Sequence, residues 1–349
     1  MISVTRFSIV QLVCLVSFSC FSAVTAQTWH VLPDGSGDAP TIQAGIDSSS
    51  AGDTVLVSCG VYFESSIVVK SGILLTSETG DARCVTIDAQ GLGRVFDCSD
   101  CDSQTEIRGL TVTHGRAPGV EPGGGIRAVG CSMKVAGCSF VANSAVGGGG
   151  AYCQGGGPSF TSCGFTSGTA ETGAGIQCWQ SSPDIVGCLF VADSTQFSGT
   201  VFCVYSAPHI ASCTFYHNFA DGGSGIFCSS FSNAVVERTI FAFGRAFAPV
   251  GFELGSNISL SCCDIFGNEF GDWVGSIADQ LGVNGNFSAD PLFCDTTNRD
   301  LRLQDCSPCV PGQREGSDCE EIVGAFPVGC DCEEATEPTT WGAIKAMYR

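Results

Sequence analysis

A Cys-x-Phe triplet recurs through the middle of the chain. Its copies are Cys138-Ser-Phe140, Cys163-Gly-Phe165, Cys188-Leu-Phe190 and Cys213-Thr-Phe215, and each begins 25 residues after the one before it. A second set of cysteines has the same period, at Cys153, Cys178, Cys203 and Cys228. A period near 25 residues with several short apolar segments is typical of a parallel solenoid, in which each repeat forms one coil and packs on its neighbours.

Each repeat is predicted to contain three short strands. Alternate residues of a strand share a face, so the Ile-x-Cys and Cys-x-Phe patterns place their named side chains inside the coil. Ile185 and Cys188 are three residues apart, which interrupts the alternation and predicts a tight turn at Gly187. The Gly-rich runs at 147–150 and 222–223 predict a looser corner.

One repeat is expected to be longer than the others. The next triplet begins at Thr239, which lies 26 residues after Cys213. If the extra residue is carried forward, Phe252 and Leu254 take the inward positions of the following strand. A strict period of 25 would bury Glu253 there instead, which an apolar core disfavours.

The cysteines of the two ladders are predicted to be packing residues. Parallel strands lie about 4.8 Å apart, whereas a disulfide requires Cβ atoms about 3.8 Å apart, so we expect most stacked thiols to stay reduced. A vertical row of thiols also cannot surround a tetrahedral metal ion. Cys59 and Cys84 are candidates for a bridge between adjacent coils. Six irregularly spaced cysteines are expected to be disulfide-bonded in part, namely Cys294, Cys306, Cys309, Cys319, Cys330 and Cys332.

Composition and the N-terminal segment restrict the function. The 349 residues carry a net charge of −20 and include only three lysines, so nucleic acid is excluded as a partner. Residues 1–26 combine Arg6, a largely apolar run and a small-residue end, which predicts a cleaved signal peptide. No later apolar run reaches the roughly 18 residues that a transmembrane helix needs. We therefore expect a secreted or cell-surface protein, in a compartment where disulfides form.

These repeats resemble those of the right-handed parallel β-helix proteins of the pectin-lyase-like superfamily, in particular bacterial secreted and surface proteins. The resemblance covers about residues 29–330. The Thr41-Ile-Gln-Ala-Gly-Ile46 segment is similar to the helix that caps the open end of such β-helices. Asp290-Pro-Leu-Phe293 resembles their closing segment.

The expected fold is all-β, a right-handed parallel β-helix solenoid with about 25 residues per coil and an N-terminal cap helix. The expected organisation is a signal peptide at 1–26, an N-terminal cap at 27–54 and a parallel β-helix at 55–270. A Cys-rich closing segment follows at 271–332. Residues 333–349 form an acidic linker and a tail that resembles C-terminal sorting segments, for which a frayed end is the equal alternative.

Three residues are catalytic candidates on their sequence context, and each has a simpler structural explanation. Asp264 begins a short string that looks superficially like one in pectin methylesterases, but the accompanying strings of that family are absent. Arg108 and Lys134 are 26 residues apart, so they are expected to be neighbours across one coil, as a lyase base and acid would be. Exposed basic residues on such a face are usually only solvated.

Two further candidates involve carboxylates. Asp193 shares a repeat position with three asparagines, so it fits a turn-forming role better than the carboxylate pair of a glycosidase. Asp184 and His209 share another position 25 residues apart and are expected to form an exposed pair. The asparagines that align with Asp193 are Asn143, Asn218 and Asn268.

An exposed row of aromatic residues is the strongest candidate for ligand binding. The outward positions beside the second cysteine ladder hold Tyr152, Trp179, Phe202 and Phe227. In the superfamily that the chain resembles, this face is the floor of the polysaccharide groove. Aromatic rows of this kind bind sugars or protein partners, and the alternative is that the protein's own Gly-rich loops cover them.

The leading hypothesis is a secreted or surface β-helix without a demonstrable catalytic site, with a role in binding, adhesion or envelope structure. A polysaccharide or cell-surface glycan is the expected partner. The alternative is a polysaccharide lyase or glycoside hydrolase that acts on an acidic polysaccharide in the same groove. No cofactor is expected, and the sequence has no motif for Ca²⁺, although calcium is used by lyases of the superfamily.

Overall fold

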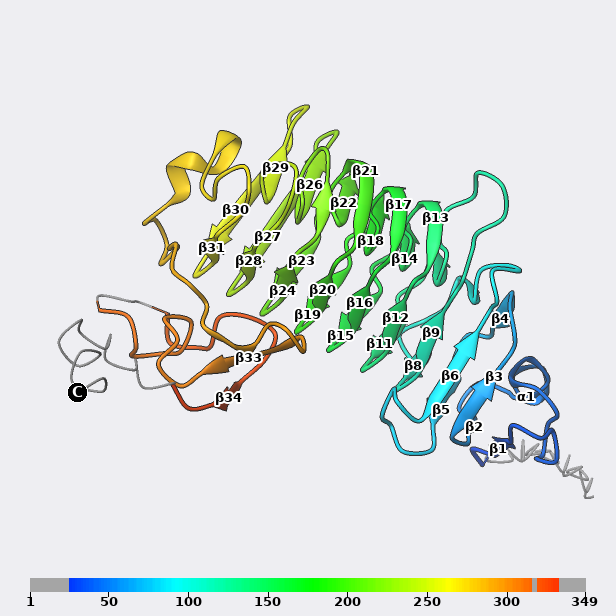
Figure 1. Ribbon diagram of the computed structural model, residues 1–349. Helices are drawn as coiled ribbons and strands as arrows, with labels where there is room; N and C mark the ends of the chain where they lie inside the picture. Colours follow the sequence, from blue (N-terminus) through cyan, green and yellow to red (C-terminus); the bar gives the residue numbers. More distant parts are fainter. Residues whose placement is uncertain (1–24, 316–318, 333–349) are drawn as a thin grey trace, which may run out of the picture.

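The computed structural model describes residues 25–315 and 319–332. The predicted signal peptide, apart from its last two residues, and the predicted tail at 333–349 lie outside the described residues. The described chain winds into a solenoid of parallel β-strands whose coils stack along one axis (Figure 1). This architecture confirms the predicted all-β parallel β-helix of about 25 residues per coil.

Three long parallel sheets, which we name A, B and C, form the sides of the solenoid. Each coil contributes one strand to each sheet through most of the length. Sheet A consists of β1 (Thr28–Val31), β2 (Thr54–Val57), β5 (Leu74–Ser77), β8 (Glu106–Arg108), β11 (Lys134–Ala136), β15 (Ser159–Thr161), β19 (Asp184–Val186), β23 (His209–Ala211), β27 (Asn233–Glu237) and β30 (Asn257–Ser261).

Sheet B carries the Cys-x-Phe triplets, and sheet C carries the second cysteine ladder. Sheet B consists of β3 (Gly60–Tyr62), β6 (Val85–Asp88), β9 (Thr111–Thr113), β12 (Ser139–Val141), β16 (Gly164–Thr166), β20 (Leu189–Val191), β24 (Thr214–Tyr216), β28 (Ile240–Ala242) and β31 (Asp264–Phe266). Sheet C consists of β4 (Ile67–Val69), β7 (Phe96–Ser99), β10 (Ile126–Val129), β14 (Ala151–Gln154), β18 (Ile176–Trp179), β22 (Val201–Val204), β26 (Ile226–Ser229) and β29 (Val250–Phe252).

The middle coils contain a fourth strand that the sequence pattern did not predict. It lies between sheets B and C, within the corner that we expected to be a loop. These strands form sheet D, which consists of β13 (Ser144–Gly147), β17 (Thr169–Thr172), β21 (Ser194–Ser198) and β25 (Phe219–Ala220). Their side chains are small and polar at most positions, so they carry no clear apolar alternation for a pattern search to find.

The interior of the solenoid is a set of stacked columns. Cys138, Cys163, Cys188 and Cys213 are at most 2% exposed and form one column, as predicted. Beside it the Phe rings of sheet B stack nearly parallel from coil to coil, with centroid separations between 4.5 and 5.0 Å. All eight ladder cysteines are buried free thiols. The predicted packing role of both ladders is therefore confirmed.

The longer coil is present, but its effect on the following strand was predicted wrongly. The extra residue lies at a corner where both Ser230 and Phe231 have positive φ angles, 54° and 60°. The corner before β29 is then shorter, because nine residues separate Phe241 from Val250, against eleven in the preceding coil. Phe252 consequently takes the position of a ladder cysteine, and Leu254 is 63% exposed.

The N-terminal opening is closed by a short helix, as the resemblance implied. Helix α1 (Ile42–Ser48) begins after Thr41, whose hydroxyl oxygen accepts the backbone N–H of Ala44 at 3.1 Å. This is the usual cap for the free N–H groups of a first helical turn. Ile42 and Ile46 point into the end of the core and are fully buried.

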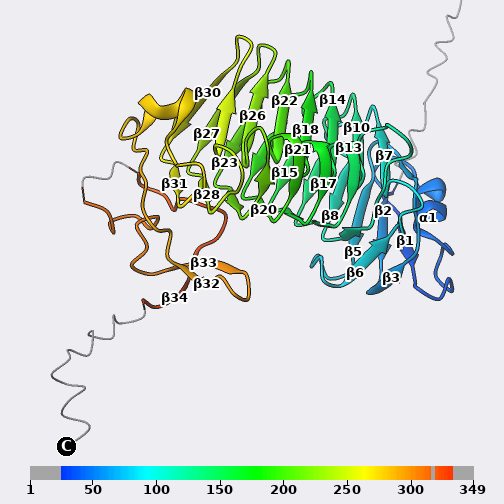
Figure 2. The same ribbon diagram turned by 45° about the horizontal axis from the view of Figure 1, so that its top comes forward.

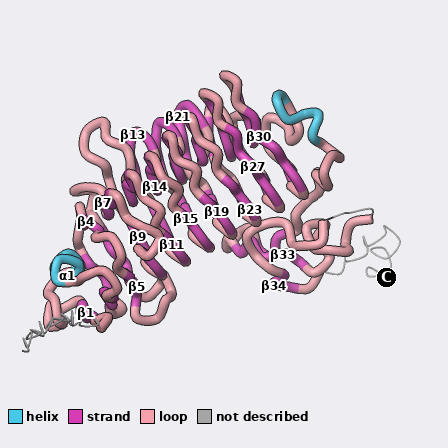
Figure 3. Tube along the Cα trace, turned by 180° about the vertical axis from the view of Figure 1, so that it is seen from behind, coloured by secondary structure: helices cyan, strands magenta, loops and turns pink. Residues whose placement is uncertain are grey.

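The C-terminal part covers both the far end and one side of the solenoid. The 3₁₀ helix η1 (Gly275–Gln280) places Ile277 on the end of the core, next to Trp273. The chain then folds back along sheet B and forms a small separate sheet (Figures 1 and 3). That sheet consists of β32 (Phe293–Asp295), β33 (Asp300–Gln304) and β34 (Val328–Cys330).

Four disulfides lie outside the ladders. Cys59–Cys84 joins adjacent coils near the N-terminus, as expected. The other three tie the C-terminal part together, and they are Cys262–Cys319, Cys294–Cys330 and Cys306–Cys332. Cys309 remains a buried free thiol, so the expected partial pairing of the terminal cysteines is confirmed.

Candidate functional site

Sheet C presents one aligned row of outward side chains along the solenoid, which we call the central row. Figure 2 shows the strands of this sheet following one another from β7 to β26. The strand register puts one residue of each coil in the row. Its members are Asp97, Arg127, Tyr152, Gln177, Phe202, Phe227 and Gly251.

Trp179 does not belong to the central row, so the predicted row of four aromatics is wrong in this respect. Tyr152, Phe202 and Phe227 each precede a ladder cysteine, whereas Trp179 follows one. It therefore lies opposite Gln154, two positions farther along the strand. Its side chain is 38% exposed, and its ring meets that of Tyr205 edge-on at a centroid distance of 6.4 Å.

The middle of the central row is closed to ligands. Tyr152 is only 8% exposed, so the expectation that it lies open is also wrong. Gln177 is equally buried, and its carboxamide occupies the space where a side chain at Gly147 would stand. For these two coils the alternative explanation, coverage by the Gly-rich corner, agrees with the structure.

The last coils of sheet C carry a groove of about 490 Å³, which we call the phenylalanine groove. Phe202 and Phe227 form its floor, with a centroid distance of 6.2 Å. Phe197 of sheet D is 65% exposed and lines one wall. The remaining lining residues are Thr172, Ser198, Gly222, Phe247, Phe252 and Glu253.

Sequence reasoning found the floor of this groove and missed its walls. Phe202 and Phe227 follow the period, so their outward direction could be derived. Phe197 and Phe247 come from the corner between sheets B and C, where coil length varies and the period carries no information. Phe247 stacks on Phe270 at 5.5 Å, which extends the aromatic surface beyond the groove.

The opposite end of the central row is charged. Arg127 donates from Nη1 to both carboxylate oxygens of Asp97, at 2.8 and 2.9 Å. Arg94, whose side chain is 5% exposed, lies 3.5 Å from Asp97 and also pairs with Glu121 of the long corner loop. Two guanidinium groups and two carboxylates thus form a compact cluster without net charge.

A second hollow lies over sheet D and is lined by polar side chains. Two adjoining cavities, of about 410 and 350 Å³, share Ser144, Thr169 and Glu171. Arg116 lies at one end and Gln196 at the other. Its hydroxyl groups repeat once per coil because Ser144, Thr169 and Ser194 are in register.

The buried acids are unsuited to act on a substrate. Asp193 is 1% exposed, and burial raises the pKa of its carboxyl group to about 7. Asp264 is fully buried under the C-terminal part, where burial raises its pKa to about 8. Its carboxyl group accepts the backbone N–H of Ala289 at 3.0 Å and contacts the Cys309 thiol at 3.4 Å. The structural explanations of both residues agree with these positions.

The predicted basic pair on sheet A is not formed. The register places Lys134 opposite Glu106, while Ala136 lies opposite Arg108. Arg108 instead pairs with Glu106 of its own strand, with Nη2 at 2.5 Å from Oε1. The reason is that β8 and β11 align 28 residues apart, two more than the separation of Arg108 and Lys134.

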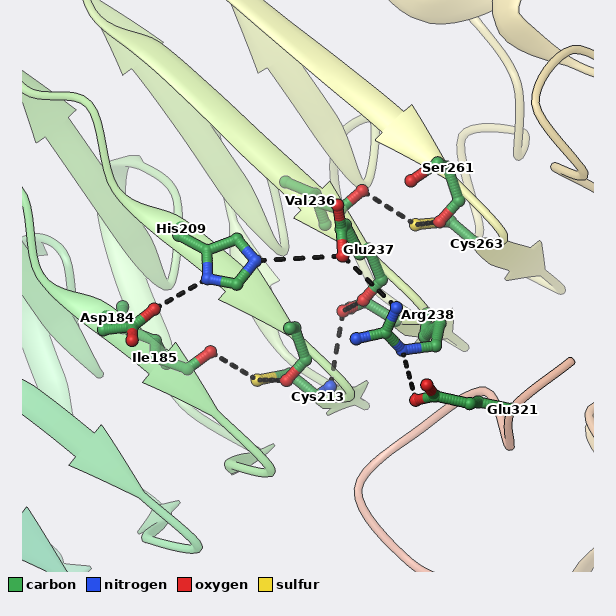
Figure 4. Close-up of polar contacts among 12 residues, drawn as sticks. Asp184, Ile185, His209, Cys213, Val236, Glu237, Arg238, Ser261, Cys263 and Glu321 are labelled. Atoms are coloured by element: carbon green, nitrogen blue, oxygen red, sulfur yellow. Dashed lines mark hydrogen bonds and ion pairs between the residues drawn. The ribbon is translucent and has the colours of Figure 1, made fainter. Parts of the chain in front are cut away.

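Asp184 and His209 do form the predicted exposed pair, on the outer face of sheet A. The distance between His209 Nδ1 and Asp184 Oδ1 is 2.7 Å, and Nε2 lies 3.9 Å from Glu237. The line of charges continues through Arg238 to Glu321 of the C-terminal part (Figure 4). No cavity found in the described part of the chain includes these residues, and the network connects that part to the solenoid.

Two groups of described residues have the composition of a metal site, but neither offers its thiols. Cys59 and Cys84, near Glu78, form a disulfide, and so do Cys306 and Cys332, near Asp305. Sulfur in a disulfide is not the thiolate that binds a metal ion. Within residues 25–315 and 319–332, no helix is long and apolar enough to span a membrane.

Comparisons with known proteins place the fold. A solved structure titled as the crystal structure of pectate lyase Pel9A is similar, with a TM-score of 0.42 and 14% sequence identity over 87% of this chain and 97% of that chain. No curated protein matches the sequence. The family model described as the right-handed beta helix region matches residues 95–288, which is more than half of the chain. The chain therefore belongs to the right-handed β-helix family.

Proposed function

We propose that this protein is exported and binds a polysaccharide or cell-surface glycan through the phenylalanine groove, in an adhesive or envelope role. The groove itself is the observation that supports this function. It is concave, it is open, and three of its phenylalanines come from outside the repeat pattern. Exposed apolar surface of this extent on an otherwise acidic, soluble-type surface is typical of a binding site.

The chemistry of the groove fits the flat apolar faces of sugar rings. The Phe202 and Phe227 rings are inclined by only 28° to each other and offer a nearly continuous surface across two coils. Glu253, Thr172 and Ser198 at the margin supply hydrogen-bonding groups. A few polar groups around an apolar floor are the common composition of small-ligand sites.

Export is supported by the disulfides together with the signal-peptide pattern. Four disulfides are formed among the described residues, and such bonds persist mainly in oxidising compartments. A secreted or cell-surface location is the corresponding proposal.

Glycan-array binding of the wild type, followed by affinity measurements, tests the proposed function. Phe202→Ala should weaken binding by about 1 to 3 kcal/mol, as expected for a central aromatic anchor. Phe231→Ala is the matched control, because Phe231 is 70% exposed but does not line the groove. Equal affinities of wild type and Phe202→Ala for every glycan that binds would contradict the proposal.

Trp179→Ala measures how far the ligand extends across sheet C. Trp179 and Tyr205 form a separate aromatic line, so they contribute only if the glycan crosses from the groove to that line. A loss in Trp179→Ala as large as in Phe202→Ala would show that the ligand spans both. A loss in Phe202→Ala alone would restrict it to the groove.

A polysaccharide lyase or glycoside hydrolase is the second candidate, and the charged cluster on the central row is the observation in its favour. Asp97 and Glu121 are two carboxylates on one face, and a glycosidase needs two. Both, however, are bound to the Arg94 guanidinium, whereas one must carry a proton for acid catalysis. Reducing-sugar and unsaturated-product assays test this candidate, and turnover that disappears in Asp97→Asn would establish it.

A further inference from the structure

A buried line of side chains runs along the turn between sheets B and D. At three coils it holds Asn143, Asn218 and Asn268, which make the same pair of hydrogen bonds. Each Oδ1 accepts the N–H of the equivalent residue one coil earlier, at 2.8 to 2.9 Å. Each Nδ2 donates to the carbonyl oxygen three residues before that, at 2.9 to 3.0 Å.

Asp193 occupies the same position between two of these coils. Its Oδ1 accepts the N–H of Gly168 at 2.7 Å, and its own N–H donates to Asn218 Oδ1 at 2.9 Å. Its Oδ2 is buried and has no hydrogen-bond partner. The step of three residues that the asparagines follow points this oxygen at the carbonyl oxygen of Phe165.

An ionised carboxylate is a poor member of this line. Oδ2 can only accept when it is ionised, and the group that its neighbours meet at this place is also an acceptor. Two buried oxygens without a proton between them would leave both unsatisfied, which costs stability. A neutral carboxylic acid has the O–H that the asparagine Nδ2 supplies elsewhere.

We propose that Asp193 is a protonated carboxylic acid in the native protein, donates its O–H to the Phe165 carbonyl oxygen, and makes this coil a pH-sensitive point of the solenoid. On deprotonation the proton leaves to solvent and the hydrogen bond between two coils is lost. The solenoid is otherwise held here by neutral contacts, so a single charge is decisive.

The surroundings of Asp193 support this assignment. The positions above and below it are Gly168 and Asn218, and the rings of Phe165 and Phe190 stack beside the turn at 5.0 Å. None of these groups titrates. Burial raises the pKa of Asp193 to about 7, the Gly168 N–H opposes this, and no charged side chain of any packed element contributes.

The device has a route to the phenylalanine groove. Strand β21 begins with the residue that follows Asp193, and Ser194 N donates to Gly168 O at 2.9 Å across the same turn. Phe197 of that strand lines the groove wall. Loss of the Asp193 hydrogen bond therefore loosens the wall, a consequence that rests on the proposed function, whereas the protonation itself does not.

Unfolding at different pH values tests the proposal. An unfolded aspartate titrates near pH 4, and the native group titrates near pH 7. Between these values only the native state keeps the proton, so the unfolding constant should rise about tenfold per pH unit. In D193N the carboxamide replaces the acid, so the ratio of wild-type to D193N unfolding constants should rise steeply from pH 4.5 to 6.5, roughly 100-fold in all.

Two further measurements make the outcome decisive. Asp221→Asn is the control, since Asp221 is exposed near the same corner of the next coil, and the wild-type ratio to this variant should stay constant. An infrared difference spectrum of wild type against D193N should show one protonated carboxyl band at pH 5.5. A carboxylate band at that pH, or a wild-type to D193N ratio that does not change with pH, would overturn the proposal whatever the protein binds.

Discussion

The middle of the solenoid and the C-terminal part hold their cysteines in opposite ways. From Cys138 to Cys228 the eight ladder cysteines are free and buried, whereas the segment after Cys262 contains three disulfides. In the solenoid every coil repeats the previous one, so equivalent side chains stack and bury each other. The C-terminal part makes a three-stranded sheet with irregular connections and rests on one side of sheet B.

The difference shows what repetition supplies. A stacked coil gains buried apolar area on both sides, so small thiols serve as well as other apolar residues. An irregular segment of about sixty residues buries less of its surface and needs cross-links, as small domains generally do. Each of the following measurements is expected to separate the two regions.

Removing one ring from the Phe stack should have the largest effect. Phe190 is fully buried, and its ring stacks on those of Phe165 and Phe215 at 5.0 and 4.5 Å. Phe190→Ala should destabilise the solenoid by about 3 to 5 kcal/mol through cavity formation. Chemical denaturation measures this, with Phe270→Ala as the control, because Phe270 is 61% exposed. Similar losses in both variants would disprove the importance of the stack.

Removing the Cys262–Cys319 disulfide should have the next largest effect. The bridge closes a loop with a sequence separation of 57 residues, and its loss should cost about 2 to 4 kcal/mol. The double Ser variant should lose hydrogen-exchange protection at Leu301 and Leu303 while Phe215 of the solenoid keeps it. Equal loss at all three positions would show that the two regions unfold as one unit.

A smaller, pH-dependent effect is expected where the C-terminal part covers β31. Burial raises the pKa of Asp264 to about 8, far above its unfolded value. The native state therefore keeps a proton that the unfolded state loses above about pH 4, so stability falls by up to about 1.4 kcal/mol per pH unit until pH 8. Asp264→Asn should flatten this slope in denaturation curves from pH 5 to 8, and an unchanged slope would contradict the assignment.

Thiol labelling should leave the native solenoid unchanged. Burial raises the pKa of Cys138, Cys163 and Cys188, so these thiols stay protonated and unreactive. Mass spectrometry after alkylation should find the ladder cysteines unmodified in native protein and fully modified in denaturant without reductant. Modification only after reduction would reveal ladder disulfides and remove the contrast between the regions.

Much of the fold could be predicted because the period links distant parts of the chain. The interval from Cys163 to Cys188 is enough to stack one coil on the next, and the alternation of Cys188 and Phe190 gives the inward face. The Cys59–Cys84 bridge followed from the same interval. The predictions failed where coil length changes, as at Leu254, since each inserted or missing residue moves the following side chains to other positions.

The candidate site divides along the same line. The sequence by itself determined that Phe202 and Phe227 point outward beside a buried cysteine, because a strand alternates its faces. Only the tertiary structure decided that Tyr152 is covered, that Trp179 stands in another row, and that Phe197 and Phe247 turn the floor into a groove. Register and corner length set these outcomes, and both depend on contacts between coils that no single repeat contains.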